Sequence, residues 1–346
     1  KTWEIISPDL TAFELDKQVI SGSPITRDIT GEEFYSTIYA IRESPIDSGQ
    51  IWVGSNDGPV HITRDGGKNW QNVTPSKLLG GGRVDAVEPS PHDPATAYFS
   101  VLRYQMGDDK PYLYKTSDYG KKWELLTDGI NGIPIDCPTR VIREDPSLPD
   151  LLYAGTDCGL FISLNGGKSW DSFQQNLPIT PVTDIKVYRD DLVISTMGRG
   201  FWVLDNLTPL YAPNFGLHMT QLYKPKDTYR MKHPKTGGDL YPRPAMFFDY
   251  FIADTVNTPI RLEIENAAGE TLNTYVSDKW DVTDTIGNMD MSSTTYLLDQ
   301  SLSRSVGHHR FKWDMRHLGP WDVRDRRSYK NGPQVASGDY RVKLTV

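Results

Sequence analysis

The sequence has little of what identifies nucleic-acid-binding, membrane-spanning or helical proteins. Lys and Arg total 37 against 45 Asp and Glu, for a formal net charge of −8, so no basic stripe is present to displace counterions from phosphates. No apolar run approaches the length that spans a bilayer, and no window has a sustained helical period. These absences argue against a nucleic-acid partner, a membrane span and a helical fold.

Familiar catalytic and metal-binding motifs are also missing. The sequence contains no phosphate loop, dinucleotide fingerprint or Ser-His-Asp signature, and its seven histidines, which include His308, His309 and His317, form no HxH or HExxH group. The polar stretch 281–296 is rich in carboxylates but lacks EF-hand spacing. We therefore expect no cofactor and no metal, with calcium in that stretch as the alternative.

Turn-forming residues are abundant, and they predict the fold class. The chain has 29 Gly and 24 Pro, with 11% aromatic residues, and its short apolar segments are separated by turn residues. We therefore expect an all-β protein of 346 residues with room for two domains.

One phrase of eight residues, which we name the box, occurs three times. Its pattern is Ser/Thr-x-Asp/Asn-x-Gly-x-x-Trp, found at residues 63–70, 116–123 and 163–170, so the copies are 53 and 47 residues apart. Four short apolar segments surround each copy, as a four-stranded meander requires. This period and strand count predict the blades of a β-propeller.

The box is expected to be structural. Its Asp or Asn can accept hydrogen bonds from the amides that follow, its glycine can supply a positive φ, and its Trp can begin the outer strand and pack on neighbouring strands. The residues concerned are Asp65, Trp70, Asp118, Trp123, Asn165 and Trp170.

The three copies resemble the Asp-box, or BNR, repeat of sialidases, sortilin-type (VPS10) receptors, some xyloglucanases and secreted bacterial propellers. The stretches 51–70, 143–161 and 195–205 are most similar to large bacterial sortilin-like or "glycosyl hydrolase BNR repeat" proteins, many without a settled activity. The resemblance covers roughly residues 1–210 and continues into the remainder. It implies an extracellular, cell-surface or periplasmic protein.

The resemblance and the strand pattern together predict two domains. Residues 1–210 are expected to form part of a propeller, with one outer strand, three full blades and most of a fourth. Residues 211–216 are expected to be a linker, and 217–346 an immunoglobulin- or fibronectin-like β-sandwich. Because residues 1–3 align with the end of a box, we expect the preceding blades on another chain or a removed segment. A self-closed ring of four blades is the alternative.

Acids and arginines occupy equivalent loop and strand-start positions of the expected blades. They could line one end of the propeller channel and bind a ligand, with an arginine clamping a sugar acid, or they could tie adjacent blades together. The candidates are Asp57, Arg83, Asp108, Asp109, Arg140, Asp157 and Arg199. A glycosidase would need two of these carboxylates at the correct separation, and no three-arginine clamp or Tyr/Glu pair of a sialidase is recognisable. No catalytic residue is assigned.

The two cysteines fall in the third blade. Cys137 precedes its first strand and Cys158 lies in the turn after its second, so the antiparallel pair brings both to the same end. A disulfide closing this loop would contribute about 3 kcal/mol on the chain-entropy estimate and would imply an oxidising compartment. Two buried free thiols are the alternative.

Binding is the function that these features favour. We expect a secreted or cell-surface propeller that binds a glycan or an extracellular protein, or serves as an assembly scaffold. The alternatives are part of a carbohydrate-active hydrolase and a sortilin-like peptide receptor. A bound sugar beside two carboxylates would favour the hydrolase, and a peptide in the channel the receptor, because propellers host many functions.

Overall fold

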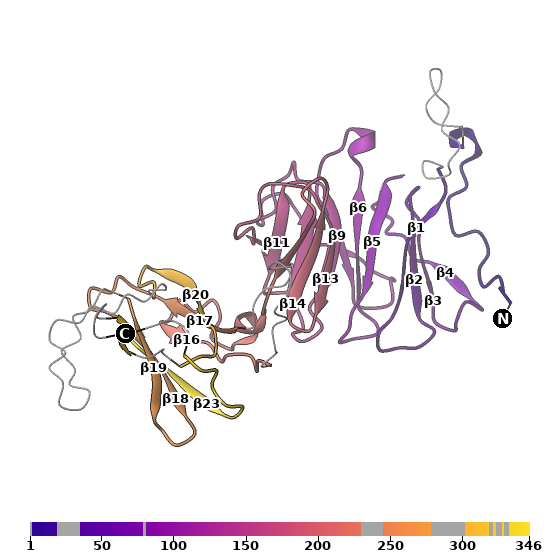
Figure 1. The fold of residues 1–346 in the computed structure, drawn as a ribbon. Coiled ribbons are helices and arrows are strands. Elements are labelled where there is room, and N and C mark those ends of the chain that lie inside the picture. The colour runs from indigo at the N-terminus through magenta and orange to yellow at the C-terminus, as the bar shows by residue number, and fades with distance from the viewer. Residues whose placement is uncertain are drawn as a thin grey trace. The chain divides into compact units, whose positions relative to one another are not determined.

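A computed structural model describes residues 2–18, 35–78, 81–229, 245–277, 302–317, 321–322, 327–328 and 332–346. The chain divides into two compact units, Lys1–Asp205 and Asn206–Val346 (Figure 1). None of the described helices could cross a membrane.

The first unit contains four antiparallel sheets in chain order, each a meander. The first sheet comprises β1 (Ile38–Glu43), β2 (Ile51–Ser55), β3 (Val60–Thr63) and β4 (Trp70–Asn72). The second comprises β5 (Arg83–Pro89), β6 (Ala97–Leu102), β7 (Tyr112–Thr116) and β8 (Glu124–Leu125). The third comprises β9 (Thr139–Glu144), β10 (Leu152–Thr156), β11 (Gly159–Ser163) and β12 (Asp171–Ser172). The fourth has three strands among the described residues, β13 (Val182–Tyr188), β14 (Asp191–Thr196) and β15 (Phe201–Leu204).

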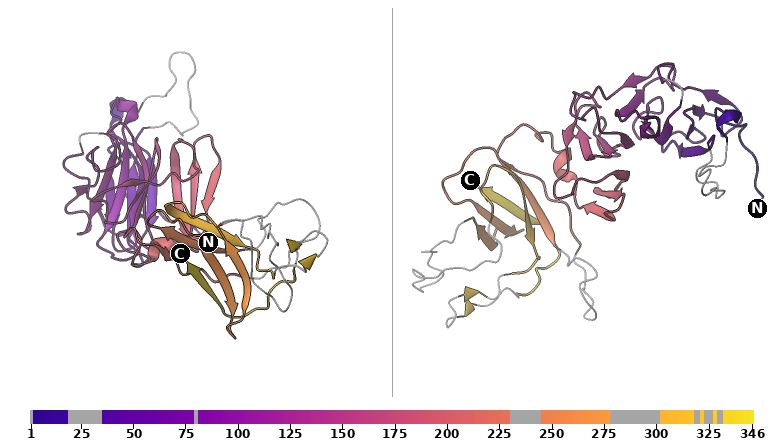
Figure 2. Two further views of the ribbon diagram at one scale, coloured as in Figure 1. Left: turned by 90° about the vertical axis from the view of Figure 1, so that its left-hand side faces the viewer. Right: turned by 90° about the horizontal axis from the view of Figure 1, so that it is seen from above.

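The sheets converge on their first strands, as propeller blades do. Strand β1 contacts β5, β5 contacts β9, and β9 contacts β13, so the sheets follow one another along an arc (Figure 2). Apolar side chains from neighbouring sheets share cores between them. The prediction of an all-β chain with four-stranded blades is confirmed.

Glycine allows two adjacent sheets to approach closely. Gly54 in β2 faces Val84 of the next sheet, where an added Cβ would overlap the Val84 methyl group, and Gly155 in β10 faces Val182 of the following sheet in the same way. A larger residue at either position would have to separate the sheets.

The second unit contains two three-stranded antiparallel sheets around one core. One has the order β16 (Gln221–Leu222), β17 (Met246–Ile252), β20 (Gly307–Trp313). The other has the order β19 (Thr271–Val276), β18 (Arg261–Asn266), β23 (Tyr340–Thr345). Leu262 and Ile264 of β18 are fully buried against Phe248 and Trp313 of the first sheet's strands.

The remaining elements are short. They are η1 (Leu15–Lys17), η2 (Tyr104–Met106), η3 (Thr208–Tyr211), β21 (Trp321–Asp322) and β22 (Arg327–Ser328). The 3₁₀ turn η3 follows directly after β15, at the boundary between the two units.

Candidate functional site

A β-bulge occurs at the same place on the first strand of every sheet. In each case one residue of the first strand is left without a partner on the second strand, which re-aims its side chain. The four residues, which we name the bulge row, are Tyr39, Asp85, Arg140 and Thr183. Because the first strands are neighbours, the row brings side chains from four sheets together.

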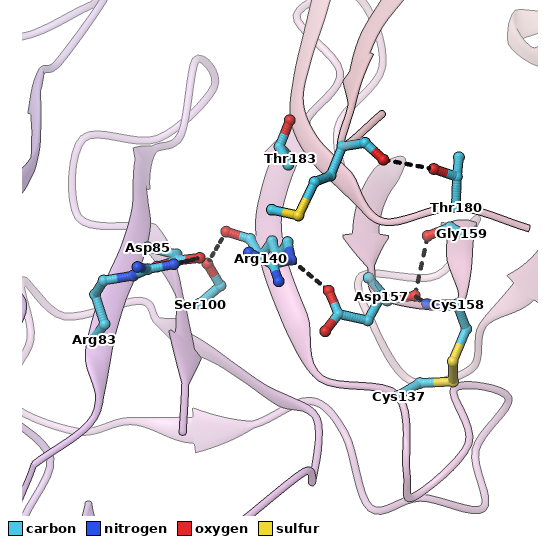
Figure 3. Close-up of polar contacts among 12 residues, drawn as sticks. Arg83, Asp85, Ser100, Cys137, Arg140, Asp157, Cys158, Gly159, Thr180 and Thr183 are labelled. Carbon is cyan, nitrogen blue, oxygen red and sulfur yellow. Dashed lines mark hydrogen bonds and ion pairs between the residues drawn. A yellow bond between two sulfur atoms is a disulfide. The ribbon is translucent and has the colours of Figure 1, made fainter. Parts of the chain in front are cut away.

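Two members of the bulge row, Asp85 and Arg140, each form an ion pair with a residue outside it (Figure 3). The Arg83 guanidinium is hydrogen-bonded through two nitrogens to the carboxylate of Asp85, and its central carbon lies 4.5 Å from the centre of the Tyr39 ring. Arg140 donates through Nε to the carboxylate of Asp157. Two arginines and two carboxylates therefore lie beside an exposed tyrosine. Their side chains are 7% to 29% exposed, and together they carry no net charge.

Burial changes the acidity of one of these carboxyl groups. It raises the pKa of Asp85, while the hydrogen bond and charge of Arg83, and the charge of Arg140, act in the opposite direction. The charge of Asp157 also raises the pKa of Asp85. The electrostatic coupling of Asp85 to both Arg140 and Asp157 places all three groups in one cluster.

Hydrogen bonds to the backbone hold the row in place. Ser100 of β6 donates its hydroxyl to the Arg140 carbonyl oxygen at 2.7 Å, which ties the second sheet to the third. The hydroxyls of Thr183 and Ser195 lie 2.8 Å apart. The row is thus fixed on rigid strands and needs no loop to order it.

A disulfide joins Cys137 and Cys158 beside this cluster, with their Cα atoms 5.6 Å apart. The Asp157 amide also donates to the Pro138 carbonyl oxygen at 2.9 Å. The turn that carries Asp157 is therefore fixed both covalently and by hydrogen bonding at the start of β9.

The other residues proposed for the channel face lie apart from the row. Asp57 is buried and accepts hydrogen bonds from the Ser55 hydroxyl at 2.5 Å and the Ala12 amide at 2.9 Å, so it braces a loop. Asp108 accepts from the Arg103 guanidinium at 3.0 Å and the Tyr112 hydroxyl at 2.8 Å.

Asp109 and Arg199 are exposed. The backbone of Arg199 belongs to a turn, where its amide donates to the Thr196 hydroxyl at 3.1 Å and its carbonyl accepts from the Trp202 indole at 3.0 Å. Of the seven candidates, the structure brings Arg83, Arg140 and Asp157 together. Sequence reasoning missed three members of the bulge row, which are Tyr39, Asp85 and Thr183.

The three boxes have one geometry. Asp65, Asp118 and Asn165 each accept a hydrogen bond, at 2.9 to 3.0 Å, from the backbone amide four residues later. Each box tryptophan donates its indole N–H to a carbonyl oxygen of the segment that precedes its blade, Trp70 to Ile6, Trp123 to Val73 and Trp170 to Leu126. Trp70 begins β4, whereas Trp123 and Trp170 directly precede β8 and β12.

A second charged row crosses the same four strands three residues beyond the bulge. It lines a groove of about 270 Å³ and consists of Arg42, Glu88, Arg143 and Lys186. The Glu88 carboxylate forms ion pairs with Arg42 at 3.4 Å and with Arg143 at 3.5 Å, and burial raises the pKa of Glu88, against the effect of both arginines. Sequence reasoning did not identify this row.

Metal chemistry has no support in the described part of the chain, where no three His, Cys, Asp or Glu residues form a cluster that could hold an ion. The His308 ring packs against the Phe251 ring at a tilt of 55°, with ring centres 4.6 Å apart, and burial lowers the pKa of His308. His309 on the opposite face bonds the Ser305 carbonyl oxygen at 2.6 Å. The stretch 281–296, where calcium was the alternative, lies outside the described residues.

No protein-family model and no curated protein matches the chain. Three solved structures of β-propeller proteins are similar to parts of it. YCF48 from Cyanidioschyzon merolae is 19% identical over 48% of this chain and 52% of its own length, with a TM-score of 0.36. A GH74 xyloglucanase from Xanthomonas campestris is 14% identical over 62% of this chain and 35% of its own, with a TM-score of 0.37.

The third is the extracellular domain of a hybrid two-component system from B. thetaiotaomicron, 16% identical over 49% of this chain and 20% of its own, with a TM-score of 0.36. This chain spans about half the length of the first of the three and less of the other two. The description of the fold therefore rests on the sheets themselves.

Proposed function

We propose that the chain is an extracellular binding propeller of the Asp-box, sortilin-like type, with an immunoglobulin-like second domain, and that the bulge row binds a glycan. The observation that carries the proposal is the alternation of Arg83, Asp85, Arg140 and Asp157 beside Tyr39, all held by neighbouring strands.

A glycan suits this surface because its hydroxyl groups both donate and accept hydrogen bonds. The two more exposed members, Asp157 at 29% and Arg83 at 21%, can respectively accept from hydroxyls and donate to them. Tyr39 is about half exposed, and with Arg83 over its ring it offers an apolar surface on which a sugar ring can pack. Because Arg83 and Arg140 balance Asp85 and Asp157, this cluster favours an uncharged saccharide over a strongly anionic one.

A glycoside hydrolase is the second candidate, and one observation favours it. Asp85, whose pKa is raised by burial, lies in the same cluster as Asp157, and glycosidases pair a protonated carboxyl group with an ionised one. Both carboxylates are, however, ion-paired with arginines, and the hydrogen bond and charge of Arg83 lower the pKa of Asp85, against the protonation that a general acid requires. Binding is therefore the better-supported function.

A glycan array that contains neutral and acidic oligosaccharides tests the proposal directly. We expect neutral oligosaccharides to bind, with an affinity that changes little between low and physiological salt, because no net charge is neutralised. The same glycans are incubated with the protein and their reducing ends are counted. Accumulation of new reducing ends, absent from an Asp157→Asn variant, would support the hydrolase instead.

Two other results would contradict glycan binding. One is a chain that binds no glycan on the array. The other is binding confined to polyanions and abolished by salt, which would assign recognition to unpaired positive charge elsewhere on the surface.

A further inference from the structure

The first unit repeats one interface from sheet to sheet. A Gly or Ser at an equivalent position of the second strand, Gly54, Ser100 or Gly155, meets the first strand of the next sheet. The paired positions show that Ser195 of β14 is the fourth member of this series. Among the described residues of the first unit, no first strand of a following sheet covers Ser195.

The same interface is left open on the first sheet. Ile38 and Ile41 occupy the positions, relative to the bulge, that Val84 and Val87 occupy in the second sheet. Val84 and Val87 are 0% and 4% exposed, whereas Ile38 and Ile41 are 42% and 65% exposed. In the second sheet the equivalent valines are covered by the first sheet, whereas these isoleucines of the first sheet are exposed.

The last sheet is open on the complementary side. Phe201 of β15 pairs with Ser195, just as Val60 pairs with Gly54 and Leu160 with Gly155. Val60 and Leu160 are buried, but Phe201 is 81% exposed. This sheet also has three strands where the other three have four.

Residues 3–6 correspond to the outer strand that the described part of the fourth sheet lacks. The indole of Trp70 donates to the Ile6 carbonyl, as Trp123 does to Val73, so Ile6 corresponds to a residue at the end of an outer strand. Trp3 lies three positions before Ile6, and Trp70 lies three positions before Val73. Residues 3–6 therefore occupy the place of an outer strand, and Trp3 is fully exposed.

We propose that a second copy of this chain covers both open faces in a head-to-tail dimer. The Ile38/Ile41 face of one copy packs on the Ser195/Phe201 face of the other, and residues 3–6 of the first copy become the fourth strand beside β15 of the second. The two-fold axis of the dimer repeats this contact between the other pair of faces. The two copies then close a ring of about eight blades, which is the upper end of the usual range for propellers. The complementarity of the two faces is what selects this occupant.

Sedimentation velocity of the full chain, between about 1 and 50 μM, tests the proposal. We expect a dimer, and at least a tenfold rise in its dissociation constant in Ile41→Asp and in Phe201→Asp, because each buries a charge at every contact. A mixture of these two variants should dimerise more tightly than either alone, since one of its two contacts joins an intact Ile38/Ile41 face to an intact Phe201 face.

Ile130→Asp is the matched control. Ile130 is also exposed, but it lies in the loop that connects β8 to β9, whereas the two open faces belong to the first and the fourth sheet. Its dimer should match that of the wild type, and thermal melting should show all three variants folded. A monomer throughout this range would overturn the proposal and leave the two faces to blades on a longer polypeptide. A dimer that is unaffected by Ile41→Asp and Phe201→Asp, or a mixture no tighter than the single variants, would also overturn it.

Discussion

Asp65 shows at the scale of one residue how the box works. Hydrogen bonds from the Asn69 side chain and backbone lower the pKa of Asp65 to about 2 from its usual 3.8. Since the folded pKa is the lower one, the ionised carboxylate stabilises the fold above about pH 4. This contribution is lost as the pH falls through about 2.

The Asp65→Asn variant separates the charge of this residue from its hydrogen bond. The third box already has Asn165, whose Oδ1 accepts from the Ser169 amide, so we expect Asp65→Asn to keep the turn and lose the pH dependence. Urea unfolding at pH 7, 4 and 2 measures this, with Asp65→Ala as the variant that loses the hydrogen bond as well. Equal loss of stability in wild type and Asp65→Asn between pH 4 and 2 would refute the assignment.

At the scale of the strands, the closeness of the sheets depends on small residues in the second strand. An alanine at Gly54 would overlap Val84, and overpacking of this kind costs about 1–3 kcal/mol. We expect Gly54→Ala to lower the free energy of unfolding by that amount. The cost should fall in part in a Val84→Ala background, because that change removes the Val84 methyl carbon that overlaps the added Cβ but keeps the Val84 Cβ at 2.7 Å from it.

Gly338→Ala is the control for this pair, because no atom lies within 4 Å of the added Cβ; its effect should stay within about 0.5 kcal/mol. Denaturant unfolding of five proteins gives all the values: wild type, Gly54→Ala, Val84→Ala, the double variant and Gly338→Ala. Additive effects of Gly54→Ala and Val84→Ala on the free energy of unfolding would contradict this prediction. They would show that contact with Val84 does not limit the size of the side chain at position 54.

The strand order of the first unit could be predicted from the sequence because each box has a fixed place in its blade. Turn chemistry at Asp65 and Gly67 is local, so the sequence is enough to locate it. The bulge row was only partly predictable. Arg83 and Arg140 attract attention as charges at strand starts, but Asp85, between Val84 and Ala86, has the alternation of an ordinary strand residue.

A bulge arises from the pairing of two strands, so the sequence of one strand alone does not predict it. The same reason hides the row of Arg42, Glu88, Arg143 and Lys186, which are 43 to 55 residues apart in sequence. The sandwich type of the second unit and the domain limits at 210 and 217 stay predictions. The structure places the division between the two units after Asp205.

For the whole molecule, the central claim is that the bulge row binds the ligand. Arg140 and Arg143 form a pair for testing it, since both are buried on β9 and ion-paired, Arg140 to Asp157 and Arg143 to Asp184 and Glu88, but only Arg140 belongs to the row. Replacing either by Gln removes one charge, and Arg143→Gln should cost the more stability because Arg143 has two carboxylate partners. Their effects on ligand affinity should differ.

The most direct measurement is calorimetric titration of wild type, Arg140→Gln and Arg143→Gln with the oligosaccharide that binds most tightly on the array. The account predicts at least about tenfold weaker binding in Arg140→Gln, a loss of about 1.4 kcal/mol, and an affinity within about twofold of wild type in Arg143→Gln. Equal losses in the two variants, or an unchanged affinity in Arg140→Gln, would contradict it and move the binding site away from the bulge row.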